Sequence, residues 1–375
     1  MDFVGAVVRA LSISFAMTWE ILWALILGFA LSAVIQAVVP KERISRLLPD
    51  DSARTLAVAS LLGAASSSCS YAAVALARSL VQKGANFTAA MAFEIASTNL
   101  VIELGIILAI LMGWQFTAAE FVGGPIMIVV LALVLRRVAS RRLVAEARAQ
   151  AERGLRGYME GHAAMDMSVS GGTLVDRIVS PRGFTAISHL FVMDWASVLR
   201  DVVGGLLIAG ALAAGVPDAF WRGFFLSDQP QLAIVWGPLV GPLISVISFV
   251  CSIGNVPLAA VLWNGGISFG GVVSFIFADL VILPVLSIKR RYYGTRMTIV
   301  LFLSFYAAMA FAGLVVEVLF GALGLVPSVR QALVAEATVT LNYTSVLNVL
   351  FLGLAAVLVV RAWRTGVGEM VAMMA

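Results

Sequence analysis

The chain has 375 residues, of which 61% are hydrophobic and 12% are charged. Soluble domains carry about 25% charged residues, so this composition excludes a soluble protein with a large core. Apolar runs of about 20 residues recur along the chain without the alternation of barrel strands, which predicts an all-α polytopic membrane protein.

The net charge is +4, and the placement of the basic residues is more informative than their number. They cluster at 41–54, 136–182, 289–296 and 361–364. Such clusters are typical of cytoplasmic loops under the positive-inside rule, so no nucleic-acid partner is expected. Two cysteines, Cys69 and Cys251, make no disulfide framework, and the sequence has no CxxC or HExxH motif. We therefore expect no metal site, no cofactor and no enzymatic activity.

In chain order, the apolar runs predict seven full membrane spans. They cover residues 18–39, 87–114, 116–135, 198–216, 269–288, 298–320 and 345–360. Two further apolar stretches, 53–82 and 232–263, are too long for one span and are interrupted near the middle by small and polar residues. Non-helical backbone at membrane depth is tolerated only where it is buried in protein or lines a wet cavity. Each stretch is therefore interpreted as a hairpin with a polar tip.

These elements divide the chain into four predicted parts. Residues 1–135 form a first membrane repeat, 136–183 a cytoplasmic linker, 184–320 a second membrane repeat, and 321–375 a C-terminal span and cytoplasmic tail. At an offset of 182 residues, 10 of the 28 positions from Cys69 to Ala96 are identical in the second half. Self-similarity at a fixed offset indicates an internal duplication.

The basic clusters orient the two repeats. If residues 53–82 crossed the membrane once, the cluster that begins at Arg136 would lie outside, against the positive-inside rule. If both interrupted stretches are re-entrant hairpins, one entering from the cytoplasm and one from outside, the basic clusters all lie inside. The repeats then have inverted topology, which in secondary transporters places the binding site near the bilayer midplane. This arrangement predicts the N-terminus outside and the C-terminus in the cytoplasm.

The two tips and the spans beside them supply the candidate substrate-binding residues. These are Ser68, Cys69, Ser70, Ser97, Thr98, Asn99, Cys251, Ser252 and Asn255. The cysteines can ligate a soft metal or metalloid as thiolates, or serve as small packed residues at a tight break. The hydroxyl and amide groups can line a solute site, or simply cap backbone carbonyls.

Asp279 and Glu103 are the candidate coupling residues. Asp279 lies in mid-span, and Glu103 shares a helix face with Asn99, four residues earlier. A carboxyl group at membrane depth is costly and is typical of a proton or ion path. Glu94 is expected nearer the cytoplasmic end, within reach of water or a basic residue, and Glu120 is interpreted as an interfacial anchor.

Several segments carry a family resemblance. They are SSSCSYAAVALARSLVQKGANF, AFEIASTNLVIELGI, GWQFTAAEFVGGPI, FVCSIGNVPLAAVLWNGGISFGGV and FIFADLVILP. These segments resemble the ArsP-type permease family, predicted permeases that include organoarsenical efflux permeases. Family members often carry a proline-flanked Cys-x-Cys near the first tip, where this chain has the single Cys69. The resemblance implies transport across the bacterial inner (plasma) membrane and leaves the solute open.

Two functions remain. The first is an inner-membrane permease, a secondary transporter acting in efflux of a small solute such as a metalloid, soft metal or sulfur-containing species. No Walker A motif is present, so the chain does not use its own ATP. The alternative is a passive channel built on the same opposed hairpins; an intramembrane enzyme would lack a base beside its Ser or Cys nucleophile. The expected partners are the lipid bilayer, the solute and a proton or ion gradient, and a homo-oligomer is compatible with the sequence.

Overall fold

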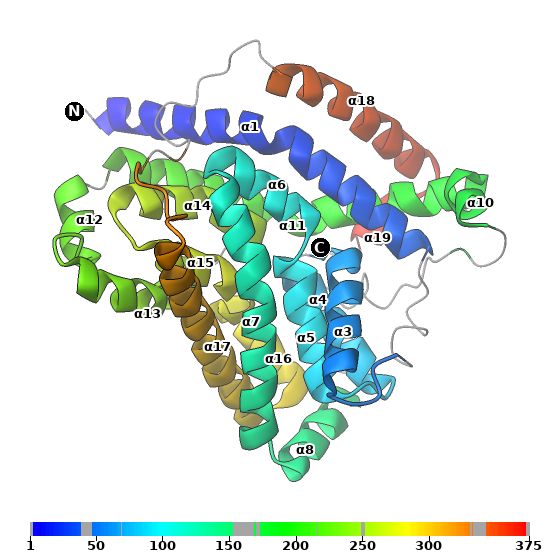
Figure 1. Ribbon diagram of the computed structural model, residues 1–375. Helices are drawn as coiled ribbons and strands as arrows, with labels where there is room; N and C mark the ends of the chain where they lie inside the picture. The colour runs from blue at the N-terminus through cyan, green and yellow to red at the C-terminus, as the bar shows by residue number, and fades with distance from the viewer. Residues whose placement is uncertain are drawn as a thin grey trace.

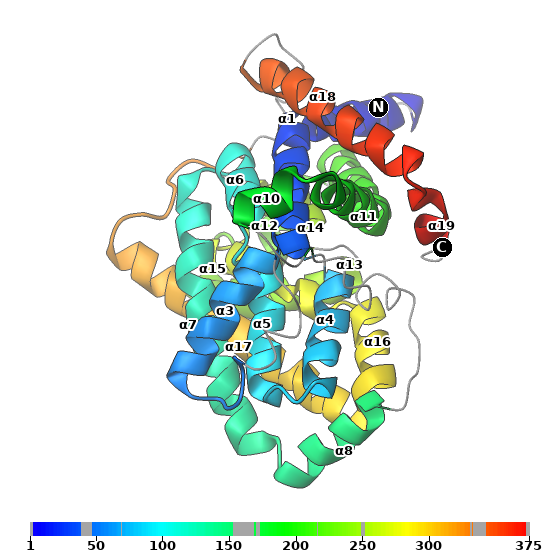
Figure 2. The same cartoon turned by 90° about the vertical axis from the view of Figure 1, so that its right-hand side faces the viewer.

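The computed structural model describes residues 3–38, 47–68, 70–152, 169, 173–215, 217–248, 252–330, 332 and 343–372, and all regular structure among them is helical. Three long helices pack on one another across the upper part of the molecule (Figures 1 and 2): α1 (Phe3–Val38), α11 (Pro181–Gly215) and α18 (Tyr343–Arg364). Two short helices, α10 (Leu174–Val179) and α19 (Val367–Ala372), pack against α11. The other helices form the lower body, which holds the candidate site.

The first half of the lower body begins with two short helices, α3 (Ala53–Ser66) and α4 (Ser70–Gln82). Ser52 caps α3, and Asp50 accepts hydrogen bonds from the Ser52 and Thr55 hydroxyls, which lower the pKa of its carboxyl. The Asn86 amide, after α4, donates to the Leu48 carbonyl, before α3, at 2.7 Å. The α3–α4 pair therefore starts and finishes at the same end of the molecule.

The α3–α4 pair packs on a bent pair of helices. These are α5 (Phe87–Asn99) and α6 (Ile102–Leu111), and they are followed by the long α7 (Trp114–Val138). The predicted span 87–114 is thus interrupted by a bend of 40° at Leu100 and Val101. The break follows from the sequence Ser-Thr-Asn, because these side chains bond back to carbonyls of the preceding turn and compete with the helix.

The second half repeats this order of elements. It contains α12 (Asp218–Phe224), α13 (Pro230–Ser248), α14 (Ser252–Gly265), α15 (Phe269–Phe277), the 3₁₀ turn η1 (Ala278–Val281), α16 (Leu283–Tyr293) and α17 (Thr295–Ala322). Ser227, before α13, donates to the Gly266 carbonyl, after α14, at 3.4 Å. The α13–α14 pair therefore also starts and finishes at one end. The predicted span 269–288 bends by 43° where Pro284 at the start of α16 cannot continue the preceding helix.

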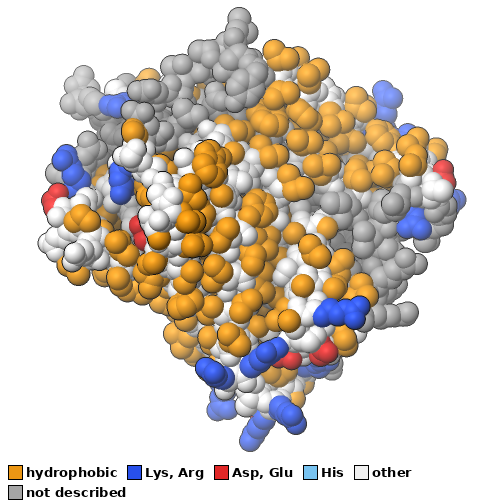
Figure 3. Space-filling model, in the orientation of Figure 1, with side chains coloured by type: hydrophobic (Ala, Val, Ile, Leu, Met, Phe, Trp, Pro, Cys, Tyr) orange, Lys and Arg blue, Asp and Glu red, His pale blue; other side chains and the backbone are white. Residues whose placement is uncertain are grey.

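The predicted linker 136–183 begins with a packed helix, α8 (Arg141–Glu152). Gln82 donates to the Ala151 carbonyl at 2.7 Å, and Gln150 donates to the Arg291 carbonyl at 3.2 Å. Figure 3 shows basic side chains gathered around this lower end, below a broad hydrophobic surface. The helix α8 therefore joins the two halves at the basic end of the molecule.

The number of predicted spans differs from the observed helices. Four described helices are long and apolar enough to cross a membrane, or six if each bent pair counts as one span. One of the four is α13, which was expected to be only one arm of a hairpin. The predicted spans 18–39 and 198–216 fall on α1 and α11, longer helices that lie outside that set and whose side chains are described only in part.

Candidate functional site

The two bent pairs meet at Asp279, which lies in η1 and is fully buried. The Ser70 hydroxyl, at the start of α4, donates to Asp279 Oδ2 at 2.6 Å. The Asn99 amide, at the end of α5, donates to Asp279 Oδ1 at 3.3 Å. Three of the predicted site residues, from both halves of the sequence, are therefore brought together.

The break between α3 and α4 is held against the end of α5. The Ser68 amide donates to the Ser97 carbonyl at 2.8 Å, and Ser67 has a positive φ of 31°. This contact places the first residue of α4, Ser70, beside the α5–α6 break. The Ser97 and Thr98 hydroxyls donate to carbonyls of their own helix, at Glu94 and Ile95, as the capping interpretation of these residues expects.

A buried ion pair lies beside Asp279. Lys289 Nζ, from α16, is 2.7 Å from Glu94 Oε1, from α5, and the two side chains are 1% and 0% exposed. The Lys289 ammonium also lies 4.0 Å from the centre of the Phe305 ring. Both partners interact electrostatically with Asp279. Lys289, expected in a cytoplasmic loop, is therefore inside the protein, and Glu94 pairs with it away from water.

Glu120 also lies inside the protein, where the sequence predicted an interfacial anchor. Its side chain is 1% exposed, and both carboxyl oxygens are buried without a hydrogen bond to any described residue. A Cβ atom on Gly123 would contact Phe277, and one on Gly124 would contact Leu100. These two glycines let α7 approach both breaks, which is why Glu120, one turn earlier, lies close enough to Asp279 for electrostatic interaction.

We call six side chains the central polar cluster: Ser70, Glu94, Asn99, Glu120, Asp279 and Lys289. All six are buried, and none is more than 1% exposed. Three were predicted as site residues. Glu120 and Lys289 were missed, although the glycines three and four residues after Glu120 mark the helix face that packs.

Two other predicted residues, Glu103 and Asn255, lie outside this cluster. Glu103 is buried on α6, where its Cβ lies against Gly28 of α1, and it interacts electrostatically with Asp194 rather than with Asp279. Asn255 is buried on α14 and donates to the Ser245 hydroxyl at 3.2 Å. The two candidate coupling residues, Glu103 and Asp279, therefore lie in different parts of the fold, and the coupling role of each stays a prediction. Their separation follows from the bend after Asn99, which turns α6 toward α1.

Both cysteines lie outside the described residues, as does the side chain of Ser252. Their predicted role at the tips of the hairpins stays a prediction. Among the described residues, no group of three or more His, Cys, Asp or Glu side chains is arranged to hold a metal ion.

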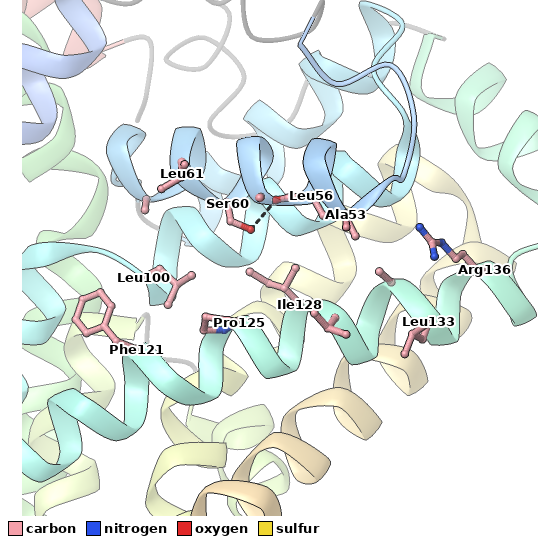
Figure 4. Close-up of a pocket in the computed structure, with 14 residues that line it drawn as sticks. Ala53, Leu56, Ser60, Leu61, Leu100, Phe121, Pro125, Ile128, Leu133 and Arg136 are labelled. Atoms are coloured by element: carbon pink, nitrogen blue, oxygen red, sulfur yellow. Dashed lines mark hydrogen bonds between the residues drawn. The ribbon is translucent and has the colours of Figure 1, made fainter.

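A separate apolar cavity of about 640 Å³ lies between α3 and α7 (Figure 4). Its lining runs from Arg136, at the basic end, to Leu100 and Phe121. Leu100 follows Asn99, so the cavity ends beside the α5–α6 break. Arg136 is paired with Asp51 at 2.5 Å, which leaves the remaining wall almost wholly apolar.

Similarity to known proteins identifies the family of this chain. The profile of the ArsP_1 predicted permease family matches residues 6–318. The chain belongs to the ArsP_1 predicted permease family. It is also 64% identical over 338 residues to "Putative permease Rv2963" of Mycobacterium tuberculosis (strain ATCC 25618 / H37Rv), covering 90% of this chain and 83% of that protein. No solved structure matches the chain.

Family membership and the membrane-length helices together make the chain a multi-pass membrane protein of a permease family. The family resemblance noted in the sequence is thereby confirmed. A permease-family assignment favours a transporter over an enzyme.

Proposed function

We propose that the protein is a secondary transporter of the bacterial inner membrane that moves a small solute outward past the central polar cluster. The observation that carries this proposal is the contact of Ser70 and Asn99 with Asp279. Three polar groups meet there, at the interface of the two halves. The Ser70 hydroxyl comes from the break between α3 and α4, the Asn99 amide from the break between α5 and α6, and the Asp279 carboxyl from the break between α15 and α16. Transporters commonly place their binding sites at such interfaces of discontinuous helices.

Matched features support an inverted repeat as the framework of this site. At the offset of 182 residues, Gly84 corresponds to Gly266, and both have positive φ. The break at Leu100 corresponds to the one at Ile282. Arg136, near the end of α7, pairs with Asp51, so the α3–α4 pair opens toward the end of the molecule where α7 finishes. Arg330, which follows α17, donates to the Trp263 carbonyl, so the α13–α14 pair opens toward the end where α17 finishes.

Burial favours a transporter over a passive channel. Asp279, Asn99 and Ser70 are each 0% exposed, so a solute reaches them only if the surrounding helices move. Alternating access to a closed site is the behaviour expected of a transporter with repeated halves. The channel stays the second candidate because opposed hairpins can also surround a pore.

The solute is proposed to be a metalloid, a soft metal ion or a small sulfur-containing species. The family resemblance and the paired positions of Cys69 and Cys251 support this class, since thiolates prefer soft ligands. A thermal-stability screen of the purified protein with these three classes identifies the solute to use. If the thiols contact that solute, Cys69→Ala and Cys251→Ala should each alter its transport. Unchanged transport in both variants would mean that the cysteines serve only as small packed residues.

The test of the function is solute flux into proteoliposomes. We expect saturable flux that responds to an imposed proton or ion gradient, and loss of that flux in Asp279→Asn with the fold retained. Glu103→Gln is the matched comparison, because Glu103 is a buried carboxyl away from the cluster. Flux that is kept in this variant and lost in Asp279→Asn assigns the coupling role to Asp279 rather than to Glu103. Flux that does not saturate and ignores every gradient would favour the channel.

A further inference from the structure

Three side chains of the central polar cluster have buried oxygens without a hydrogen-bond donor among the described residues. The Glu94 carboxyl is paired with the Lys289 ammonium through one oxygen, Oε1, at 2.7 Å. The Glu120 carboxyl has no such partner, and neither has Asn99 Oδ1, whose amide nitrogen is used on Asp279 and on the Thr98 hydroxyl. Buried acceptors are rarely left without a donor, because the unmade bond costs about 1–3 kcal/mol. We therefore expect a proton or another hydrogen-bond donor at these buried oxygens.

The central polar cluster also has fewer positive groups than acidic ones. It contains three carboxyl groups, Glu94, Glu120 and Asp279, and one ammonium group, Lys289, which is 2.7 Å from Glu94. If all four were ionised, the buried cluster would carry uncompensated negative charge in a medium that does not solvate it. A carboxylate buried without a partner is costly and is usually neutralised by a proton.

The elements packed around Glu120 and Asp279 offer no second cation among their described side chains. Arg78 on α4 donates to the Ala151 carbonyl, Glu103 on α6 faces α1, and on α17 Tyr306 donates to the Leu239 carbonyl and Glu317 accepts from the Gly270 amide. The remaining ionisable groups on α16 and α17 are Arg290, Arg291, Tyr292, Tyr293 and Arg296. The three arginines are exposed, Tyr292 lies under Arg78, and the buried Tyr293 hydroxyl lacks a hydrogen bond.

The donors also distinguish the two carboxyls that Lys289 does not pair with. Asp279 accepts hydrogen bonds from Ser70 and Asn99, whereas Glu120 accepts none. Hydrogen bonds to a carboxylate favour its ionised form, and burial without them disfavours it. Two neighbouring carboxyls in unlike surroundings therefore divide into one acid and one carboxylate.

We propose that Glu120 is held as the neutral acid and is the proton carrier of this protein, with Asp279 as its ionised partner. The proton removes the charge that the buried Glu120 carboxyl would otherwise carry without a donor or a cation beside it. When the site opens, the Glu120 O–H bond breaks, the proton passes to water and a carboxylate remains; a proton taken from water on the other side restores the acid. The inference rests on the proposed function only in holding that this proton moves with the solute.

Infrared spectroscopy of the purified wild-type protein, without any solute, tests where the proton lies. We expect a protonated-carboxyl band of the wild type to be lost in Glu120→Gln and kept in Asp279→Asn. Glu317→Gln is the matched control, because Glu317 is a half-buried acid that already accepts a hydrogen bond from the Gly270 amide, and this variant should keep the band.

Thermal unfolding between about pH 6 and pH 9 gives a second readout. The proton stabilises the folded protein, so the wild-type midpoint should fall as pH rises, whereas Glu120→Gln should lose that part of the slope. Loss of the band in Asp279→Asn instead, or a midpoint restored at high pH by Na⁺ with no carboxyl band, would overturn the proposal. So would failure of Glu120→Gln to fold, because Gln copies the shape of the neutral acid. None of these measurements depends on solute flux. The proposal for Glu120 is therefore tested separately from the proposed transport function.

Discussion

At the scale of single residues, the buried pair of Glu94 and Lys289 makes each of its two charges sensitive to loss of the other. Its charges are removed from water, so each is tolerated only because the other is 2.7 Å away. Breaking such a pair by removing one partner costs about 3–5 kcal/mol, while replacing both by apolar residues is often neutral. Removing one partner of this pair therefore costs more than removing one partner of an exposed ion pair.

We therefore expect Glu94→Leu and Lys289→Met each to lower the free energy of unfolding by about 3–5 kcal/mol, and the double variant to recover most of that loss. Reversible unfolding in detergent by chemical denaturant measures all three. Glu146→Gln is the control, because the Arg142–Glu146 pair is exposed and should contribute less than about 1 kcal/mol. A double variant that is merely the sum of the two losses would show that the charges do not compensate each other.

The sequence identified part of the central polar cluster. Asp279, Ser70 and Asn99 were found because polar groups inside apolar runs are conspicuous, and the structure brings them together. Glu120 and Lys289 were missed because depth was judged from the ends of apolar runs. The number of residues between a side chain and the end of its apolar run does not show which face of the helix is buried. Glu120 and Lys289 both lie on helix faces that pack against other helices.

At the scale of elements, close packing depends on glycines in the first arm of each helix pair. A Cβ atom on Gly63 of α3 would lie 2.5 Å from the Phe93 carbonyl oxygen of α5. A Cβ atom on Gly241 of α13 would lie 2.4 Å from the Gly271 carbonyl oxygen of α15. In both halves the first arm can therefore approach the bent pair only through a residue without a side chain.

Gly63→Ala and Gly241→Ala should each destabilise the protein by about 1–3 kcal/mol, because the added methyl group meets backbone that cannot move aside. Gly353→Ala on α18 is the control, since nothing lies within 4 Å of its Cβ position. Alanine is the better helix former, so this control should be neutral or slightly stabilising. Thermal midpoints measure the three variants, and equal midpoints at all three positions would contradict the packing argument.

The elements were predicted unevenly. The breaks after Ser66 and Ser248 were expected, because small and polar residues there interrupt long apolar stretches. The bends at Leu100 and Ile282 were not, since each lies in a run short enough for one span. The cause is local chemistry that hydropathy does not record: hydroxyls that bond back to the helix before Leu100, and Pro284 after Ile282.

At the scale of the whole molecule, charge and helix direction point to one orientation. The basic end holds α8, the end of α7 and the exposed Arg290 and Arg291 of α16. The α3–α4 pair opens at this end, and the α13–α14 pair opens at the opposite end. From the positive-inside rule we propose that the basic end lies in the cytoplasm. The two pairs would then enter the membrane from opposite sides, as the proposed inverted arrangement requires.

Single cysteines test this orientation in whole cells. In a background with Cys69→Ala and Cys251→Ala, we expect a membrane-impermeant thiol reagent added outside to label Asp228→Cys, which is exposed before α13. It should spare Lys83→Cys, which is exposed after α4. Glu146→Cys on the exposed surface of α8 is the matched control, and it should react only after the membrane is permeabilised. Labelling of both Lys83→Cys and Asp228→Cys from outside would place the two openings on one side. The two halves would then be parallel, and a shared site reached alternately through opposed hairpins would have to be abandoned.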